Sequence, residues 1–485
     1  MSDSLGNKSR KGLAWDLVGV FFRQVGILVV TVILARLLTP EEFGIVGMAM
    51  VFVSITQVFI TVGFTDGIIQ KKGISNLELS SVFYVNFTIS AVLAAVIYLS
   101  ATAIGNFYDE PEVTAVLQYL AVIPVFAGLG RVHSAILTKR MDFKALTVRD
   151  IIATILGGIV GVVAAFQGQG VYALVWQQIV VAVAGTILLW IGSGWLPQWR
   201  FSFEKIRSLL SFSAYVFFDQ VLRQVFAKID TLFIGKVFSA ATLGFYSRAE
   251  SLNAQVSNYT STSLRKIIFP ALSSIQDDDE RFEKIYFKVL KMAVFVSVIS
   301  AAVLFFLAQE IILLLLGDQW QASVILFQIM VFRLLSAPLG PLMGKAMLAK
   351  GYSKEKFRIS QLQRLIMLTP LPIGYYYGVE AFTITLVVAK FAGVLINMVL
   401  MEHLFGFKFR NQLVILVKPN LPFVALILVY VIMPFSIPGL VKAVLFLPVY
   451  LAYSYLLKDE GAYLIYQEIR RMIGLIKQRL RPINS

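Results

Sequence analysis

The sequence predicts an all-α polytopic membrane protein, on the strength of three observations. Hydrophobic residues make up 58% of the chain and charged residues only 15%, whereas soluble domains carry about 25% charged residues. The apolar residues come in blocks of roughly 18 to 25, the length of a helix that spans a ~30 Å hydrocarbon core. These blocks recur along all 485 residues, so the chain is not a soluble domain with one anchor.

We expect about fourteen transmembrane helices. The first apolar block, 15–37, is too long for the apolar region of a signal peptide, so no cleaved leader is predicted. The blocks at 209–238 and 241–264 are the least hydrophobic. The expected helices are 15–37, 43–64, 80–103, 114–137, 148–166, 171–192, 209–238, 241–264, 287–308, 322–349, 358–377, 379–403, 417–434 and 440–457.

Basic loops alternate with acidic or short loops along the chain. Lysine and arginine concentrate in cytoplasmic loops, so this alternation predicts cytoplasmic termini and an even number of spans. It also explains the net charge of +15 more simply than nucleic-acid binding does. Arg36, Lys236 and Lys442 are exceptions at outer helix ends. The basic loops hold Lys71 and Lys72; Lys139, Arg140 and Lys144; Arg200, Lys205 and Arg207; Arg281 and Lys284; Lys350, Lys354 and Lys356; and Lys408 and Arg410.

The sequence partly repeats itself after 200 residues. Arg23-Gln24-Val25 falls on Arg223-Gln224-Val225, and Gly44 falls on Gly244. A polar tripeptide shared in the middle of two membrane helices predicts two six-helix lobes as parallel repeats around a central cavity, an architecture of secondary transporters. The expected divisions are the lobes 1–200 and 201–403, the transmembrane helix pair 404–457 and a basic amphipathic cytoplasmic tail 458–485.

Ionisable residues inside predicted spans are the candidate site. Such residues are costly in lipid and usually face a cavity or a partner. Arginine matches phosphate geometry and stays charged, so a cationic cavity between the lobes would suit a phosphate. The alternative is structural pairing, as between Asp219 and Arg223 at i,i+4. The candidates are Arg23, Arg223, Asp16, Asp219, Arg248, Arg333 and Arg364, with His133 and Lys390 as further ionisable residues in spans.

Signals for other chemistry are few. The chain has no cysteine and only two histidines, so neither thiolate chemistry nor a histidine metal cluster is expected. Residues 277–280, Asp-Asp-Asp-Glu, precede a predicted helix and suit helix capping better than magnesium binding. We expect no catalytic residues, metal or cofactor, and hence no enzyme.

Several ordered motifs resemble one family. Residues 35–44, ARLLTPEEFG, resemble the turn after the first helix of Wzx-type polysaccharide exporters in the multidrug/oligosaccharidyl-lipid/polysaccharide superfamily. The pieces at 243–249, 269–273 and 316–320 resemble the family in the same order. The resemblance covers about residues 10 to 400 and is strongest to the exporters of colanic acid and teichuronic acid.

This resemblance implies a flippase in the bacterial cytoplasmic (inner) membrane. Its cargo would be an oligosaccharide linked to undecaprenyl diphosphate, moved from the inner to the outer leaflet by alternating access. It would serve the biosynthesis of exopolysaccharide or lipopolysaccharide. The expected partners are this lipid-linked saccharide, membrane lipids, and the polymerase and glycosyltransferases of the same pathway, with no nucleic acid.

Four alternatives stay open. Two belong to the same superfamily, a lipid II flippase and a drug:cation antiporter, although such antiporters usually stop at twelve helices. A third is a membrane-embedded polysaccharide polymerase or ligase, for which a sizeable reactive outer loop is expected; no outer loop here exceeds about 15 residues. The fourth is a structural partner of a glycosyltransferase complex.

Overall fold

The computed structural model describes residues 23–61, 67–69, 71, 73–207, 214–432, 438–457, 459–467 and 470. These residues form helices and connecting turns, with no β-strand among them. The predicted all-α class is therefore confirmed. The chain divides into two compact units, Met1–Ser247 and Arg248–Ser485. The predicted lobes 1–200 and 201–403 concern the internal repeat, and their boundary stays a prediction.

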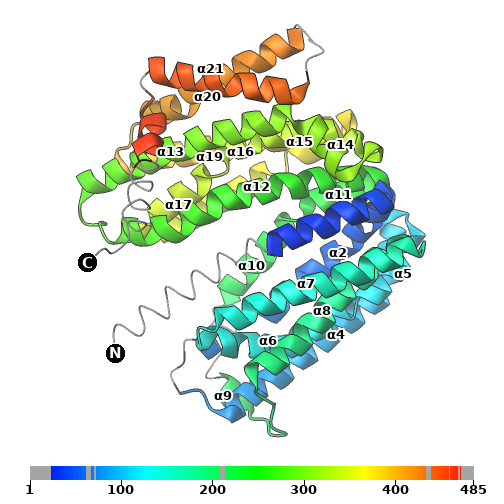
Figure 1. Cartoon of the computed structure of the whole chain (residues 1–485). Coiled ribbons are helices and arrows are strands. Elements are labelled where there is room, and N and C mark those ends of the chain that lie inside the picture. Colours follow the sequence, from blue (N-terminus) through cyan, green and yellow to red (C-terminus); the bar gives the residue numbers. More distant parts are fainter. Residues whose placement is uncertain are drawn as a thin grey trace, which may run out of the picture. The chain divides into compact units, whose positions relative to one another are not determined.

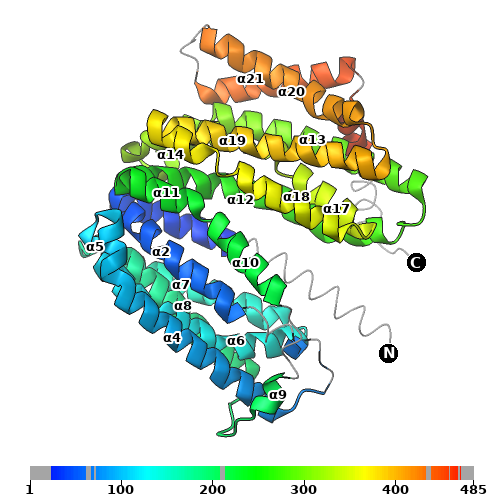
Figure 2. The same cartoon turned by 180° about the vertical axis from the view of Figure 1, so that it is seen from behind.

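The first unit is a bundle of helices. Helices α7 and α8 lie side by side in both views, and α6 packs against both α4 and α8 (Figures 1 and 2). Helix α2 contacts α4, α5, α6 and α8 on one part of its surface and α10 and α11 on another. Its elements are a helix over 23–37, α2 (Pro40–Thr61), α4 (Asn76–Tyr108), α5 (Pro111–Leu120), α6 (Ile123–Lys139), α7 (Phe143–Phe166), α8 (Val171–Ser193), α9 (Phe203–Arg207), α10 (Ala214–Phe226), α11 (Ile229–Val237) and the start of α12 (Ala240–Ser273).

The second unit is built around α13. This helix contacts α15, α16, α17, α20 and α21, so it forms the centre of the unit. Besides most of α12, the elements are α13 (Asp279–Phe306), α14 (Ala308–Leu316), the short 3-10 helix η1 (Asp318–Trp320), α15 (Ala322–Val331), α16 (Arg333–Ser336), α17 (Leu339–Ala349), α18 (Ser353–Ile366), α19 (Pro370–Phe405), α20 (Phe409–Ile432) and α21 (Gly439–Leu456).

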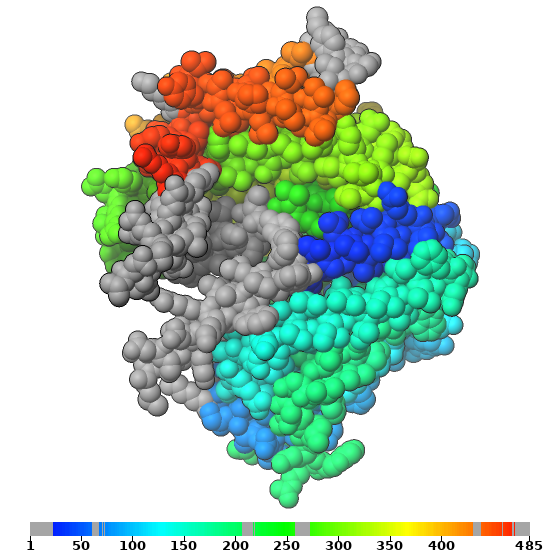
Figure 3. Space-filling model, in the orientation of Figure 1, coloured from blue at the N-terminus to red at the C-terminus, as the bar shows by residue number. Residues whose placement is uncertain are grey.

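The last helix pair, α20 and α21, forms an outer layer on α13, drawn in orange in Figure 3. Phenyl rings hold it there, with Phe306 beside both Phe423 and Phe446. Polar contacts fasten it as well, because the Glu310 carboxylate accepts a hydrogen bond of 2.5 Å from the backbone N–H of Gly439, at the start of α21. The pair that lies outside the repeat is thus an integral part of the second unit.

Ten of the described helices are long and apolar enough to cross a membrane, which makes this a multi-pass membrane protein. The count of fourteen stays a prediction. Of the four remaining expected spans, 15–37 lies partly outside the described residues. The span 209–238 also lies partly outside them. Its described part and the spans 241–264 and 358–377 correspond to helices that do not meet these criteria of length and apolarity.

Several expected continuous helices are interrupted. The block 114–137 divides into α5 and α6, and Pro124 lies in the first turn of α6, where proline is tolerated because its missing N–H has no helical partner. The block 322–349 divides into α15, α16 and α17, with Pro338 immediately before α17. The block 209–238 divides into α10 and α11, and nothing in the structure explains that break. The stretches 111–139 and 322–349 still each form one candidate membrane span, so these two expected spans are confirmed despite their interruptions.

Helix α19 contains a sharp turn at Gly378, whose φ of 91° and ψ of 177° are not helical. Glycine adopts such positive φ values without a side-chain clash. The helical segment before it, together with α18, corresponds to the expected helix 358–377. The segment after it corresponds to 379–403, so the predicted boundary between these two helices is confirmed.

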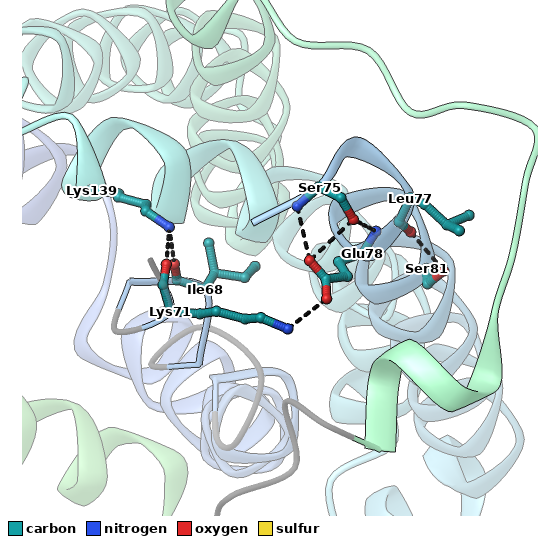
Figure 4. Close-up of polar contacts among 7 residues, drawn as sticks. All are labelled: Ile68, Lys71, Ser75, Leu77, Glu78, Ser81 and Lys139. Carbon is teal, nitrogen blue, oxygen red and sulfur yellow. Dashed lines mark hydrogen bonds and ion pairs between the residues drawn. The ribbon is translucent and has the colours of Figure 1, made fainter. Parts of the chain in front are cut away.

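At one end of the first unit, three loops that the charge pattern assigns to the same side meet. The Lys139 ammonium donates to the backbone carbonyls of Ile68, at 2.9 Å, and Lys71, at 2.5 Å (Figure 4). The Lys71 side chain in turn pairs with Glu78 at 2.6 Å. Arg140 donates to the carbonyl of Ser193 at 2.8 Å. The loops around 71, 140 and 193 therefore share one end of the unit.

The other end of the first unit brings the two repeats into contact. A Cβ atom on Gly44 would lie 1.8 Å from the carbonyl oxygen of Ala240, and one on Gly244 would lie 1.8 Å from that of Pro40. Each residue of this contact is shifted by 200 from its counterpart, so α2 and α12 cross through a symmetric pair of glycines. Only glycine permits this approach.

Candidate functional site

Arg23 belongs to a charge cluster between two helices of the first unit. Its guanidinium lies 3.1 Å from the Asp150 carboxylate, which also pairs with Arg149 at 2.6 Å. The Nε of Arg149 donates to the carbonyl of Gly185 on α8. Asp16, the predicted neighbour of Arg23, lies outside the described residues. Arg149 and Asp150 were not predicted; two adjacent charges at the start of the expected span 148–166 were the available signal.

Arg223 has a local partner on α10. Its guanidinium lies 2.6 Å from the Asp219 carboxylate, one helical turn earlier. The Arg223 side chain is 70% exposed, whereas that of Asp219 is 17% exposed. The structure therefore contains the pairing that was the alternative to a cavity role. Arg23 and Arg223, although equivalent in the repeat, have carboxylate partners from different parts of the chain.

The second unit contains a polar cavity of about 370 Å³. It lies among α12, α16, α17, α18 and α19. Arg333 is the predicted candidate that lines it; Arg364 and Arg248 are not among the lining residues, and Arg364 bonds to Gln361 on its own helix. The polar lining residues are Glu250, Asn253, Ser257, Arg333, Ser336, Lys356, Gln363, Lys390 and Asn397.

The cavity carries an excess of positive charge. Arg333 forms an ion pair with Glu250, which joins α16 to α12. The described lining adds two lysines, Lys356 and Lys390, and no further carboxylate. Three cationic side chains and one carboxylate therefore line the cavity.

Helix α18 forms the polar wall of this cavity because of its own composition. None of its residues, Ser353 to Ile366, is buried. Lys356, Ser360 and Gln363 are spaced by four and three residues and so share one face. The Lys356 ammonium lies 3.2 Å from the Ser360 hydroxyl, and Gln363 donates to the carbonyl of Gly393 on α19 at 2.8 Å. Lys354 and Lys356, both expected in the connection before the helix 358–377, lie in the first turns of α18, between two candidate membrane spans.

Two amides complete the lining. Asn253 on α12 and Asn397 on α19 are 3% and 2% exposed. Within the described part of the chain, the side-chain oxygen of each has no hydrogen-bond partner. A buried amide oxygen without a donor costs about 1–3 kcal/mol. Neither residue was predicted from the sequence, because the candidates were ionisable residues and asparagine carries no charge.

His133 has a structural environment. It is fully buried, its Nδ1 lies 2.8 Å from the Ser193 hydroxyl, and its ring packs on Trp190. The acidic run 277–280 behaves as predicted, since the Asp278 side chain accepts from the backbone N–H of Arg281 and caps α13. No group of three or more potential metal ligands lies close enough together in the described ranges to hold an ion.

Curated relatives cover most of the chain. It is 22% identical to the lipopolysaccharide biosynthesis protein WzxC of Escherichia coli K12, over 76% of each chain. It is 23% identical to the teichuronic acid biosynthesis protein TuaB of Bacillus subtilis, over 73% of this chain and 74% of TuaB. The succinoglycan biosynthesis transport protein ExoT of Rhizobium meliloti is 26% identical over 61% of this chain and 60% of its own.

Two solved structures share the fold. The lipid II flippase MurJ, in an inward closed conformation, aligns with a TM-score of 0.72 at 17% identity, over 91% of this chain and 98% of its own. An inward-facing multidrug resistance MATE transporter of the MOP superfamily aligns with a TM-score of 0.61 at 14% identity, over 79% and 94%. The sequence model described as "Polysaccharide biosynthesis protein" matches residues 33–325, more than half of the chain. The chain therefore belongs to this family of polysaccharide biosynthesis proteins, and its resemblance to the Wzx-type exporters is confirmed.

Proposed function

We propose that this protein is a flippase that moves undecaprenyl-diphosphate-linked oligosaccharide from the inner to the outer leaflet of the bacterial cytoplasmic membrane. The observation that carries the proposal is the polar, net cationic cavity inside a bundle of membrane helices. Cations inside a membrane bundle are costly and usually face a partner, a ligand or a water-filled passage. The printed names of relatives in polysaccharide biosynthesis support a saccharide cargo, and the fold shared with a lipid II flippase supports a lipid-linked one.

In this proposal the charged side chains of both lobes line the path of the diphosphate-sugar head group. Arg23 and Arg223 contact the phosphates. Between transport cycles their carboxylate partners compensate their positive charges inside the membrane. Asp16, Asp219, Arg248, Arg333 and Arg364 belong to the same path. The lobes 1–200 and 201–403 alternate between access to the two leaflets, and the prenyl tail stays in the lipid. The pathway polymerase and glycosyltransferases act on either side of this step.

Depletion of the protein in its own cell tests this function. Lipid-linked saccharide repeat units should accumulate, and surface polysaccharide should fall. Accumulation of lipid II instead would show that this protein is a lipid II flippase. Unchanged pools of both, together with a new drug sensitivity, would favour the antiporter. Loss of polymer chain length with normal export of single units would favour a polymerase.

Reporter fusions test the proposed orientation. Fusions after Ser485 and within the loop Asp109–Glu112 should report opposite sides of the membrane, with Ser485 in the cytoplasm. The same side for both would contradict the fourteen-helix arrangement. In this arrangement the basic tail, 458–485, lies on the inner leaflet, so its removal should leave export largely intact.

A further inference from the structure

The connection between α8 and α9, residues 194–202, is held against α4 by two hydrogen bonds. The backbone N–H of Gln198 donates to the Ser80 hydroxyl at 2.8 Å, and that of Ser202 donates to the Ser81 hydroxyl at 2.9 Å. Both serines are fully buried. The backbone between these two bonds therefore has a fixed position against the helix.

Between these two bonds the connection exposes large apolar side chains. Trp199 is 95% exposed and Phe201 is 54% exposed. Exposed apolar side chains next to one another mark contacts with a membrane or a partner. Helix α4 is a candidate membrane span, and tryptophan is enriched where membrane and water meet. We therefore expect this part of the connection to lie at the membrane interface.

A groove of about 570 Å³ lies between the connection and α4. The spacing of its α4 residues places them on one face of the helix, over about 7 Å of its length. The Trp199 ring lies 6.4 Å, between centroids, from the Tyr84 ring. The groove is lined by Tyr84, Val85, Thr88 and Ile89 of α4 and by Trp199, Arg200 and Phe201 of the connection.

The lining of this groove suits one end of a lipid better than a soluble ligand. Apolar side chains dominate it, and the exposed Arg200 is the charged side chain among the described lining residues. A guanidinium binds phosphate through parallel hydrogen bonds. A peptide would need partners for its own backbone groups, whereas an acyl chain needs none. An acyl chain with a phosphate at its end therefore matches both features.

We propose that this groove binds one anionic phospholipid. Its acyl chain lies along Val85 and Ile89, and its phosphate contacts Arg200. The lipid belongs to the leaflet at the end of the unit where Lys71 and Lys139 meet. It fastens the connection 194–202 to the membrane, whatever cargo the protein carries.

Native mass spectrometry of the purified full-length protein tests this assignment by counting the lipids that stay bound. Dioleoyl phosphatidylglycerol should fill one saturable site. Dioleoyl phosphatidylethanolamine has the same chains without net charge and should bind about fivefold more weakly. Arg200→Gln should weaken phosphatidylglycerol binding by a similar factor and make the two lipids equivalent. Lys205→Gln is the matched control, since Lys205 is exposed on α9 and does not line the groove.

A second pair of variants tests the place of the acyl chain. Thr88 is exposed, so Thr88→Trp should fill the groove without disturbing the core and should abolish the saturable site for both lipids. Val92→Trp is its control, because Val92 lies one turn further along α4, is exposed and does not line the groove. If Thr88→Trp cannot be purified, the comparison of Arg200→Gln with Lys205→Gln decides alone.

Each other result overturns the proposal. Equal affinities of the two lipids in the wild type would remove the role of the anionic head group. Equal losses in Arg200→Gln and Lys205→Gln would leave only a general surface charge. Equal binding in Thr88→Trp and Val92→Trp would place the acyl chain outside the groove. A lipid count that rises without saturation would show bulk lipid and no site.

Discussion

The two units place their ion pairs in different surroundings. In the first unit, the described ion pairs join cations directly to carboxylates, as in the cluster of Arg23, Arg149 and Asp150. In the second unit, one such pair lies in the wall of a cavity that has two additional lysines and two unsatisfied amides. The pair in the second unit therefore faces a polar cavity, whereas the cluster in the first unit lies between helices.

The two units also differ in how their helices pack. In the first unit, α2 and α12 approach so closely that a Cβ on Gly44 or Gly244 would overlap a backbone carbonyl. Small residues allow such approach in membranes, where there is no hydrophobic force to drive helices together. In the second unit, large aromatic rings such as Phe306, Phe423 and Phe446 fill the interface between α13 and the last helix pair. The contact between α2 and α12 tolerates no larger side chain at the glycines, whereas the contact between α13 and the last helix pair depends on large side chains.

Enlarging the crossing glycine should have the largest effect. Gly44→Leu places a side chain where the carbonyl of Ala240 lies, so the folded protein should fall to undetectable levels on a membrane immunoblot. Gly47→Ala is the control on the same helix, because a Cβ there would lie 3.6 Å from the nearest atom of Leu243, an ordinary contact. Normal abundance of Gly44→Leu would show that α2 and α12 do not cross this closely.

Removing Arg223 distinguishes transport from scaffolding in the first unit. Exposed i,i+4 pairs stabilise by only about 0.3–0.5 kcal/mol, so Arg223→Ala should leave abundance unchanged. If the guanidinium contacts phosphate in the rate-limiting state, export should slow about 10- to 100-fold, and Arg223→Lys should retain more activity. If Arg223→Ala instead lowers abundance, and Asp219→Ala/Arg223→Ala restores both abundance and export, the two residues form a structural ion pair.

Neutralising one carboxylate in each unit tests the contrast directly. Asp150→Asn removes the partner of Arg23 and Arg149 and should lower protein abundance several-fold. Glu250 lies in the wall of a cavity, so Glu250→Gln should change abundance little. Asp142→Asn is the control for α7, because asparagine caps a helix as well as aspartate does. Equal loss of abundance in Asp150→Asn and Glu250→Gln would remove the distinction between the units.

The smallest expected effect concerns Glu110, in the acidic loop between α4 and α5 of the first unit. Burial raises the pKa of Glu110, and the charges of Glu41 and Glu112 raise it further. A carboxyl whose folded pKa is raised binds its proton more tightly in the folded state. The stability therefore increases as the pH falls through that folded pKa, until the unfolded chain binds its proton too. Glu110→Gln should raise the unfolding midpoint at pH 7 by about 1–2 °C and flatten its pH dependence.

The control for this effect is Glu112→Gln, which removes an exposed charge near Glu110. It should give a smaller rise in the midpoint, since it relieves only part of the repulsion. The backbone N–H of Ala240 also bonds to Glu110, and glutamine can still accept this bond. A lower midpoint in Glu110→Gln, or an unchanged pH dependence, would contradict the proposed repulsion.

Charge patterning along the chain anticipated a local contact but not those that close only in three dimensions. Lys236 contradicted the alternation of basic and acidic loops, and the structure pairs it with Asp109 at 2.6 Å. An isolated cation at a helix end is thus explained by a carboxylate 127 residues earlier. Pairing of Arg223 with Asp219 was foreseen because i,i+4 partners are fixed by helical geometry alone. Pairing of Arg23 with Asp150 was not foreseen, since it depends on which helices become neighbours.

The amino-acid sequence by itself determined the helical membrane class, the approximate helix boundaries and the family, because hydrophobic blocks, glycine turns and local motifs are properties of short segments. Only the tertiary structure decided which polar residues meet. Lys356, Gln363 and Asn397 are unremarkable in sequence, yet α18 and α19 bring them to one cavity with Glu250 and Arg333. Helix packing chooses such neighbours through the shapes of apolar surfaces many residues apart, and no local pattern in the chain contains that choice.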